Sequence, residues 1–199
     1  MNAFFERHQL LKDILGIIGF LLAVIVGAAL INQLLFRSFS VSGPSMEPTL
    51  FTGDRLIVNR LPMTWAALRG SPYVPERVHV IVFKNPHWQP GSQDEFIVKR
   101  VVAFPGERVD LKDDKLIVYT NNNPNGLVFD DAYKGPTTPS STGIGIPTTV
   151  PDGEIFVAGD HRQNGYSLDS RNGLGTVPYS DIIGPVTMRI FPFTHFRTF

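Results

Sequence analysis

Cysteine is absent: none of the 199 residues is one. This absence excludes disulfide bonds and thiolate metal sites anywhere in the chain. It is compatible with a location outside the cytoplasm but does not establish one. Excess charge is also missing, because 18 basic residues balance 18 acidic ones. A net charge of zero gives no general attraction to nucleic acid, so we expect no nucleic-acid partner.

Sustained helical periodicity is missing after Phe36. The segments that follow are short, rich in β-branched and aromatic residues and separated by turn sequences, which is typical of β-strands. We expect strands at Arg55–Val58, Val78–Phe83, Phe96–Val102, Lys115–Tyr119, Glu154–Ala158 and Pro185–Ile190. Only Thr64–Leu68 suggests a helix, and only a single turn of one. This pattern predicts a mostly β domain.

A long apolar run precedes that domain. Ile14–Phe36 comprises 23 residues without a formal charge. At about 1.5 Å per residue a helix of this length spans roughly 35 Å, enough to cross a hydrocarbon core of roughly 30 Å. A cleavable signal is the alternative, but its apolar region is typically shorter, roughly 7–15 residues, and ends at a small-x-small site. No such site is evident here, so a retained anchor is favoured. The flanking charges nearly cancel and predict no orientation.

The organisation we expect is an N-terminal segment (1–13), a transmembrane anchor (14–36) and a catalytic β domain (37–199). Residues 110–151 are expected to form an inserted appendage. Within it, Lys134–Thr149 is dominated by Gly, Pro, Ser and Thr, and this composition predicts a long exposed loop. The preceding Asn121–Gly126 is typical of a turn.

Ser45 lies only nine residues after the apolar run, between Pro44 and Pro48 and close to Gly43. Each proline fixes its own φ and restricts the residue before it, so the hydroxyl is held in a rigid turn. Nine extended residues reach at most about 30 Å, which keeps Ser45 near the membrane. A serine becomes nucleophilic only when a base removes its proton. His8 precedes the run, His195 is near the C-terminus, and His79 and His87 show no serine or carboxylate pattern around them, so a Ser-His-Asp triad is not expected.

Lys99 is an alternative base. The two-residue period of a strand places it on one face with Ile97 and Val101, while Arg100 faces the other way. Burial among apolar residues would lower the pKa of a lysine and supply the neutral amine that serine activation needs. An edge-strand lysine that discourages aggregation is an equally good interpretation of the pattern.

Polar residues are concentrated in Gly159–Arg171, directly after the apolar strand Ile155–Ala158. A loop in this position commonly carries function. Asp160, His161 and Asp169 do not match an established metal-ligand spacing, so we expect no metal. An Asp169–Arg171 or Asp160–Arg162 ion pair would be compatible with bracing a site.

Four sequence strings together resemble the type I signal peptidases, membrane-anchored serine proteases that remove signal peptides from exported proteins. They are SGPSMEPTL, GDRLIVNR, FIVKRVVAFPGERV and GDHRQNGYSLDSRNGLG, in the order of the family and behind an N-terminal anchor. The resemblance implies a mostly antiparallel β fold with a smaller β appendage. It also implies a catalytic domain on the outer side of a cytoplasmic membrane, with residues 1–13 in the cytoplasm, and no cofactor.

The resemblance assigns residue roles. It makes Ser45 the nucleophile and Lys99 the general base, with Ser167 orienting the lysine amine. Supporting residues would be Asp160, Asp169 and Arg171. Small pockets for alanine-like side chains would be built from Phe39, Val41, Ile97 and Val98.

Two features depart from the family pattern. The backbone N–H of Ser45 would supply one oxyanion donor, but Gly43 stands where some members have a serine that supplies the second. Gln163–Ser167 is two residues longer than the compact form of its string, and His161 replaces the usual asparagine.

We therefore expect an endopeptidase that cleaves after small-x-small sites, with signal peptides of preproteins and membrane lipid as partners and the export machinery as a further candidate. The alternatives are a non-catalytic membrane-tethered β module and a self-cleaving Ser/Lys protease. The latter occurs with a DNA-binding module, and none precedes Ser45 in this sequence.

Overall fold

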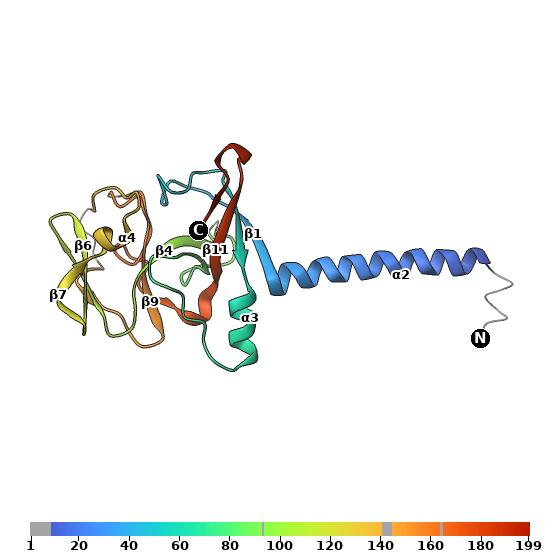
Figure 1. Ribbon diagram of the computed structural model, residues 1–199, viewed down its shortest axis with the longest axis horizontal. Coiled ribbons are helices and arrows are strands. Elements are labelled where there is room, and N and C mark those ends of the chain that lie inside the picture. Colours follow the sequence, from blue (N-terminus) through green and yellow to red (C-terminus); the bar gives the residue numbers. More distant parts are fainter. Residues whose placement is uncertain (1–8, 93, 141–144, 164) are drawn as a thin grey trace.

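The N-terminal helix projects alone from a β domain in the computed structural model, which describes residues 9–92, 94–140, 145–163 and 165–199 (Figure 1). Helix α2 (Gln9–Leu30) continues into a π-helical turn, η1 (Ile31–Leu35). Together they comprise 27 residues with a mean hydropathy of 3.0 over the most apolar window, and none of that window is buried. Length and composition suit this helix to crossing a membrane. Residues 1–8 of the expected N-terminal segment lie outside the described residues.

The larger of two antiparallel sheets follows the helix and has the strand order β1-β2-β11-β3-β4-β9-β10, with β12 paired to β11. Its strands are β1 (Phe36–Ser40), β2 (Arg55–Asn59), β3 (Val80–Lys84), β4 (Phe96–Ala103), β9 (Glu154–Ala158), β10 (Val177–Pro178), β11 (Ile182–Phe191) and β12 (Arg197–Thr198).

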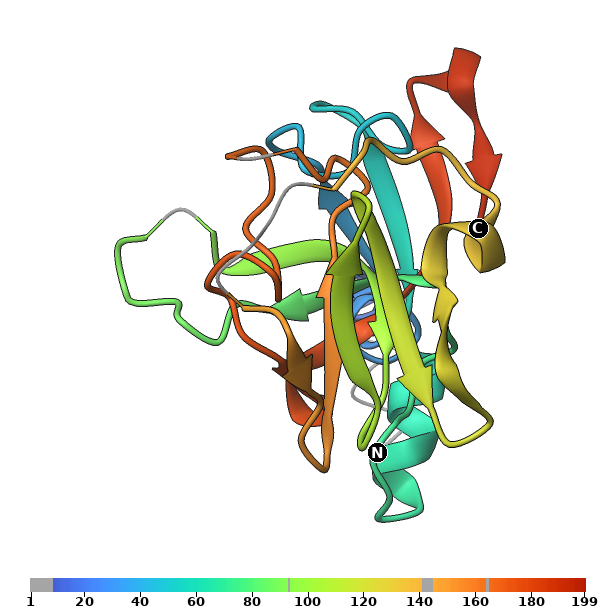
Figure 2. The ribbon, with the colours of Figure 1, turned by 90° about the vertical axis from the view of Figure 1, so that its left-hand side faces the viewer.

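The smaller sheet has the order β7-β6-β5-β8 and lies in front of the larger one in the view from the side opposite the anchor (Figure 2). Its strands are β5 (Arg108–Lys112), β6 (Lys115–Thr120), β7 (Asn123–Val128) and β8 (Thr148–Thr149). An apolar helix followed by two antiparallel sheets confirms the predicted fold class. The domain boundaries stay a prediction.

Several elements differ from the sequence expectation. The Asn-rich segment expected to be a turn supplies β7, because the chain reverses at Asn121 and Asn122 and then pairs with β6. Helix α3 (Leu61–Leu68) is longer than the single turn expected. The remaining short helices are α4 (Phe129–Tyr133), η2 (Tyr179–Asp181) and η3 (Phe193–His195).

Strand β4 lies at the centre of the packing. Ile97 and Val101 belong to one buried apolar cluster, while Val102 and Ala103 belong to a second. Val98 packs against a third cluster, which also holds Met46 and Leu50 from the turn after β1. Because β3 and β9 pair with its two edges, β4 is covered on both faces and both sides. Six of its eight residues, Lys99 among them, are therefore buried, and Phe96 and Val98 are half-buried.

Candidate active site

Ser45 lies in a tight turn between β1 and β2. The N–H of Glu47 donates to the carbonyl of Pro44 at 3.0 Å, which closes the turn around the serine. Gly43 enters it with φ of +85°, a left-handed conformation that favours glycine. Met46 is fully buried and fastens the turn to the core, while Ser45 itself is half-buried. The turn thus presents its hydroxyl from a fixed backbone.

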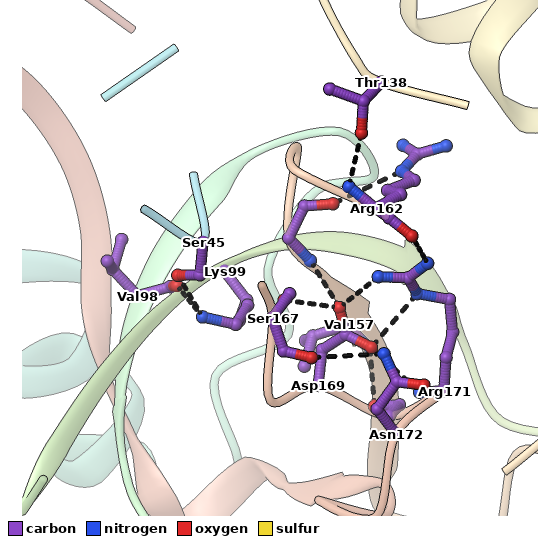
Figure 3. Close-up of polar contacts among 12 residues, drawn as sticks. Ser45, Val98, Lys99, Thr138, Val157, Arg162, Ser167, Asp169, Arg171 and Asn172 are labelled. Carbon is purple, nitrogen blue, oxygen red and sulfur yellow. Dashed lines mark hydrogen bonds and ion pairs between the residues drawn. The ribbon is translucent and has the colours of Figure 1, made fainter. Parts of the chain in front are cut away.

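Lys99 meets that hydroxyl: its Nζ lies 2.8 Å from Ser45 Oγ and 2.9 Å from the carbonyl oxygen of Val98 (Figure 3). Its side chain is only 3% exposed. Burial disfavours the charged ammonium and lowers the pKa of Lys99 from 10.5 to about 8, against the opposing effect of the Asp169 and Asp160 carboxylates. Of the two interpretations of this lysine, the buried one is confirmed and the edge-strand one is wrong.

Asp169 organises the segment that follows β9. Its fully buried carboxylate accepts hydrogen bonds from the N–H of Gly159 at 2.9 Å and from the Ser167 hydroxyl at 2.6 Å. It also forms the expected ion pair with Arg171, at 2.7 Å. These bonds hold the segment against the sheet in one conformation.

Ser167 approaches the backbone of Ser45 through Gly159. A Cβ built on Gly159 would lie 2.3 Å from Ser167 Oγ and 2.3 Å from the carbonyl oxygen of Ser45, so only glycine permits this packing. The hydrogen bond of the Ser167 hydroxyl goes to Asp169. Its predicted role in orienting the Lys99 amine stays a prediction.

Asp160 joins the turn that carries Ser45 to β4. Its carboxylate accepts from Thr49 Oγ1 at 2.5 Å and pairs with Arg100 at 2.5 Å. Arg100 points away from Lys99, so Asp160 ties together the two chain segments that carry Ser45 and Lys99. The alternative pair of Asp160 with Arg162 is wrong, because Arg162 pairs with Asp130 of α4.

Sequence reasoning missed Thr49, Arg100 and the first half of the loop at 134–149. Arg100 had a signal, since its neighbours on that face, Val98 and Val102, are apolar. The loop was expected to be exposed, but the N–H of Thr138 donates to the Asp160 carbonyl at 3.0 Å and Ser140 is buried. No local sequence pattern predicts such long-range contacts. Residues 141–144 of the loop lie outside the described residues.

Two adjoining cavities open beside the paired side chains. The smaller, about 160 Å³, contains both Ser45 and Lys99 and is also lined by Gly43, Ile97, Tyr166 and Leu168. The larger, about 310 Å³, is lined by Phe39, Val41 and Val98. Both include Ser42, Asp94 and Phe96. The four residues expected to build substrate pockets thus lie along this pair of cavities.

Metal ligands do not gather here: among the described residues, no three or more His, Cys, Asp or Glu side chains form a group that could hold an ion.

Comparison with known proteins gives consistent results. Residues 13–191 match the family described as "Signal peptidase, peptidase S26". The chain is 33% identical over 190 residues to Signal peptidase I of Bacillus licheniformis, covering 89% of this chain and 88% of that protein. It is 33% identical over 202 residues to Signal peptidase I P of Bacillus subtilis subsp. natto, covering 97% and 98%. A crystal structure of a signal peptidase I from Enterococcus faecalis is 28% identical, with a TM-score of 0.42, over 59% of this chain and 100% of that one.

Proposed function

This chain belongs to the signal peptidase family, peptidase family S26, and we propose that it removes signal peptides from exported preproteins with Ser45 as nucleophile and Lys99 as general base. Family membership makes it a serine endopeptidase of the signal peptidase I type. The observation that carries the residue assignment is the 2.8 Å contact between a serine hydroxyl and a buried lysine amine.

The chemistry follows from the protonation state of Lys99. The neutral amine accepts the proton of Ser45 as Oγ attacks the scissile carbonyl carbon, and the carbonyl oxygen becomes an oxyanion. The ammonium then gives that proton to the departing amine, the C–N bond breaks and an acyl-enzyme remains. A water molecule attacks the acyl carbon as Lys99 removes a proton from that water. The Lys99 ammonium then gives this proton to Ser45 Oγ as the ester bond breaks, which releases the signal peptide and restores both residues.

Oxyanion stabilisation is assigned to the backbone N–H of Ser45, which a tight turn holds in place. Gly43 contributes through its backbone conformation and offers no side-chain donor. Asp160, Asp169 and Arg171 act by fastening the surrounding segments to β4 and β9. Ser167 extends this support to the backbone of Ser45 through the packing at Gly159.

Small-x-small selectivity is consistent with the two cavities. The side chain before the scissile bond would lie beside Ile97 in the smaller cavity, and alternate residues of an extended substrate point the same way. Phe39, Val41 and Val98 would surround the second small side chain in the larger cavity. A volume of about 160 Å³ around the reacting atoms suits alanine better than an aromatic residue.

The anchor confines the enzyme to the bilayer that also holds the apolar segment of the substrate. This shared location raises the effective concentration of the substrate at the active site. We propose a single-pass protein of the cell membrane with residues 37–199 on the extracytoplasmic side. Contact with the export machinery is a further proposal.

The test is cleavage of a preprotein by the purified full-length protein in detergent, with sequencing of the new N-terminus. Ser45→Ala and Lys99→Ala are each expected to lower the cleavage rate by at least about 10³-fold. Lys99→Met provides a second variant that preserves side-chain length.

Lys115→Ala is the matched control, because its side chain is 54% exposed and it belongs to β6 of the smaller sheet, whereas Lys99 belongs to the larger one. The Lys115→Ala variant should cleave the preprotein at the wild-type rate. Full activity of a folded Ser45→Ala or Lys99→Met variant, with folding checked by circular dichroism, would refute the assignment.

A further inference from the structure

Two aromatic rings stack beside the paired serine and lysine. The rings of His161 and Tyr166 are 4.1 Å apart between centroids and inclined by only 7°. Both belong to the segment after β9 that is two residues longer than the compact form of its string. Tyr166 lines the cavity that contains Ser45 and Lys99, although half of its surface is exposed to solvent.

His161 is tied to the nucleophile turn at two points. Its backbone N–H donates to the carbonyl oxygen of Ser45 at 3.1 Å. Its ring Nδ1 lies 4.0 Å from a carboxylate oxygen of Glu47, and the side chain is only 13% exposed. The imidazole is therefore fixed relative to Ser45 by backbone and by packing.

The backbone of Tyr166 is held by a weaker contact than that of His161. Its N–H lies 3.4 Å from the carbonyl oxygen of Gln163, a long hydrogen bond at the tip of the segment. Among the described residues, the stack on His161 is a close ring contact that holds the phenol in place. His161 thus determines where the Tyr166 ring stands with respect to Ser45.

Tyr166 and Leu168 line the smaller cavity but not the larger one. Since the proposed function places the residues before the scissile bond along the two cavities, starting from Ser45, the chain after that bond must leave on the remaining side. That side is the one bounded by Tyr166 and Leu168.

We propose that Tyr166, held by its stack on His161, forms a wall that restricts the size of the first residue after the scissile bond. This inference rests on the proposed function and adds a specificity-determining residue, Tyr166, and a positioning residue, His161. A phenol ring in the wall of the cavity of about 160 Å³ that contains Ser45 leaves room for a small side chain and obstructs an indole or branched one. The enzyme therefore selects small residues at the start of the mature protein.

The experiment compares preproteins that carry alanine or tryptophan at the first position after the cleaved bond, with kcat/KM measured for each. Tyr166→Ala is expected to raise the tryptophan-to-alanine ratio by about tenfold, the effect of relieving one steric conflict in an enzyme pocket. His161→Ala should raise the ratio similarly, because the unsupported ring moves away. His161→Phe restores a flat partner and should return the ratio to that of the wild type.

The double variant Tyr166→Ala/His161→Ala separates positioning from a direct role for His161. If His161 acts through Tyr166, the double variant has the same ratio as Tyr166→Ala alone. Phe193→Ala is the matched control: it removes an aromatic ring that is 82% exposed in η3, and its ratio should equal that of the wild type.

An unchanged ratio in Tyr166→Ala overturns the proposal, as does a change that follows the residue before the bond and not the one after it. These results differ from failure of the proposed function, in which the wild-type protein cleaves neither preprotein or the Ser45→Ala variant cleaves both.

Discussion

At the scale of the residue, Lys99 owes its lowered pKa to its position on β4. An exposed lysine is almost wholly protonated at neutral pH and takes no proton from a hydroxyl. Burial on a strand covered on both faces lowers the pKa of Lys99 to about 8, so a substantial fraction of the amine is neutral under mild conditions. The same apolar neighbours that stabilise the sheet therefore favour the neutral amine that the proposed mechanism requires.

The first prediction at this scale concerns pH. Because the base must be neutral, the single-turnover rate should rise with pH, reach half its maximum near pH 8 and level off above it. The measurement is rapid-quench cleavage between pH 6 and 10. A rate that is level from pH 6 to 10 would contradict a lysine base with this pKa.

The second prediction concerns stability. A fall in pKa from 10.5 to about 8 corresponds to about 3 kcal/mol of unfavourable charge burial, at about 1.4 kcal/mol per pKa unit. Lys99→Met removes this cost, so we expect it to raise the free energy of unfolding at pH 7 by about 1–3 kcal/mol, measured by denaturant titration.

The sign can be checked through the pH dependence. Between pH 8 and 10.5 the unfolded protein binds more protons at Lys99 than the folded one, so the stability of the wild type rises with pH in this window. The advantage of Lys99→Met should shrink over the same window. Lys115→Met, at an exposed site, should change stability by less than about 0.5 kcal/mol.

At the scale of the element, the decisive junction is the one that Asp160 makes between the turn after β1 and strand β4. Neither element specifies the distance from Ser45 to Lys99 by itself. Thr49 and Arg100 both bond to the same buried carboxylate, and this shared partner sets the spacing. The junction also buries a guanidinium whose charge would otherwise be uncompensated.

Asp160→Ala is therefore expected to destabilise the protein by about 3–5 kcal/mol, because it leaves Arg100 buried without its carboxylate. It should also reduce kcat, since the turn that carries Ser45 loses its tie to β4. Chemical denaturation and the preprotein assay give the two measurements.

Asp110→Ala is the control for this prediction, since the Arg108–Asp110 pair has side chains that are 45% and 22% exposed. Breaking a solvent-accessible pair should cost no more than about 1 kcal/mol. Equal losses of stability in the two variants would contradict the structural role of Asp160.

At the scale of the whole molecule, the anchor and the β domain are joined by a short connection. The N–H of Arg60 donates to the carbonyl of Leu35 at 2.7 Å, and the Thr64 hydroxyl donates to the carbonyl of Leu34 at 2.8 Å. These bonds fasten the start of α3 to the end of the apolar N-terminal helix. The β domain is thereby fixed to the segment proposed to anchor it.

The orientation across the membrane can be tested directly because the chain has no cysteine. Ser180→Cys, at an exposed position, should react with a membrane-impermeant maleimide added outside intact cells. Asn2→Cys should react only after the membrane is permeabilised. The opposite pattern would show that the β domain faces the cytoplasm.

Local patterns predicted much of the architecture. The apolar run, the strand segments and the exclusion of thiol chemistry depend only on nearest-neighbour composition and periodicity, which a sequence displays directly. The strings around Ser45, Lys99 and Asp169 also identified the candidate site, because the chemistry-bearing residues lie in short, recognisable segments. Strand β7 was missed because Asn121–Gly126 contains turn-forming asparagines and, in the same few residues, the start of the strand that pairs with β6.

The sequence by itself determined the apolar helix long enough to cross a membrane, the mostly β domain and the serine and lysine to examine. Only the tertiary structure decided that Lys99 is buried, that Asp160 pairs with Arg100 and not with Arg162, and that Tyr166 lines the same cavity as Ser45. The physical reason is the separation along the chain of the residues that interact. Periodicity is local and tells which face of a strand a side chain occupies. The partners of that side chain come from distant segments: Thr49 and Asp160, for example, are 111 positions apart.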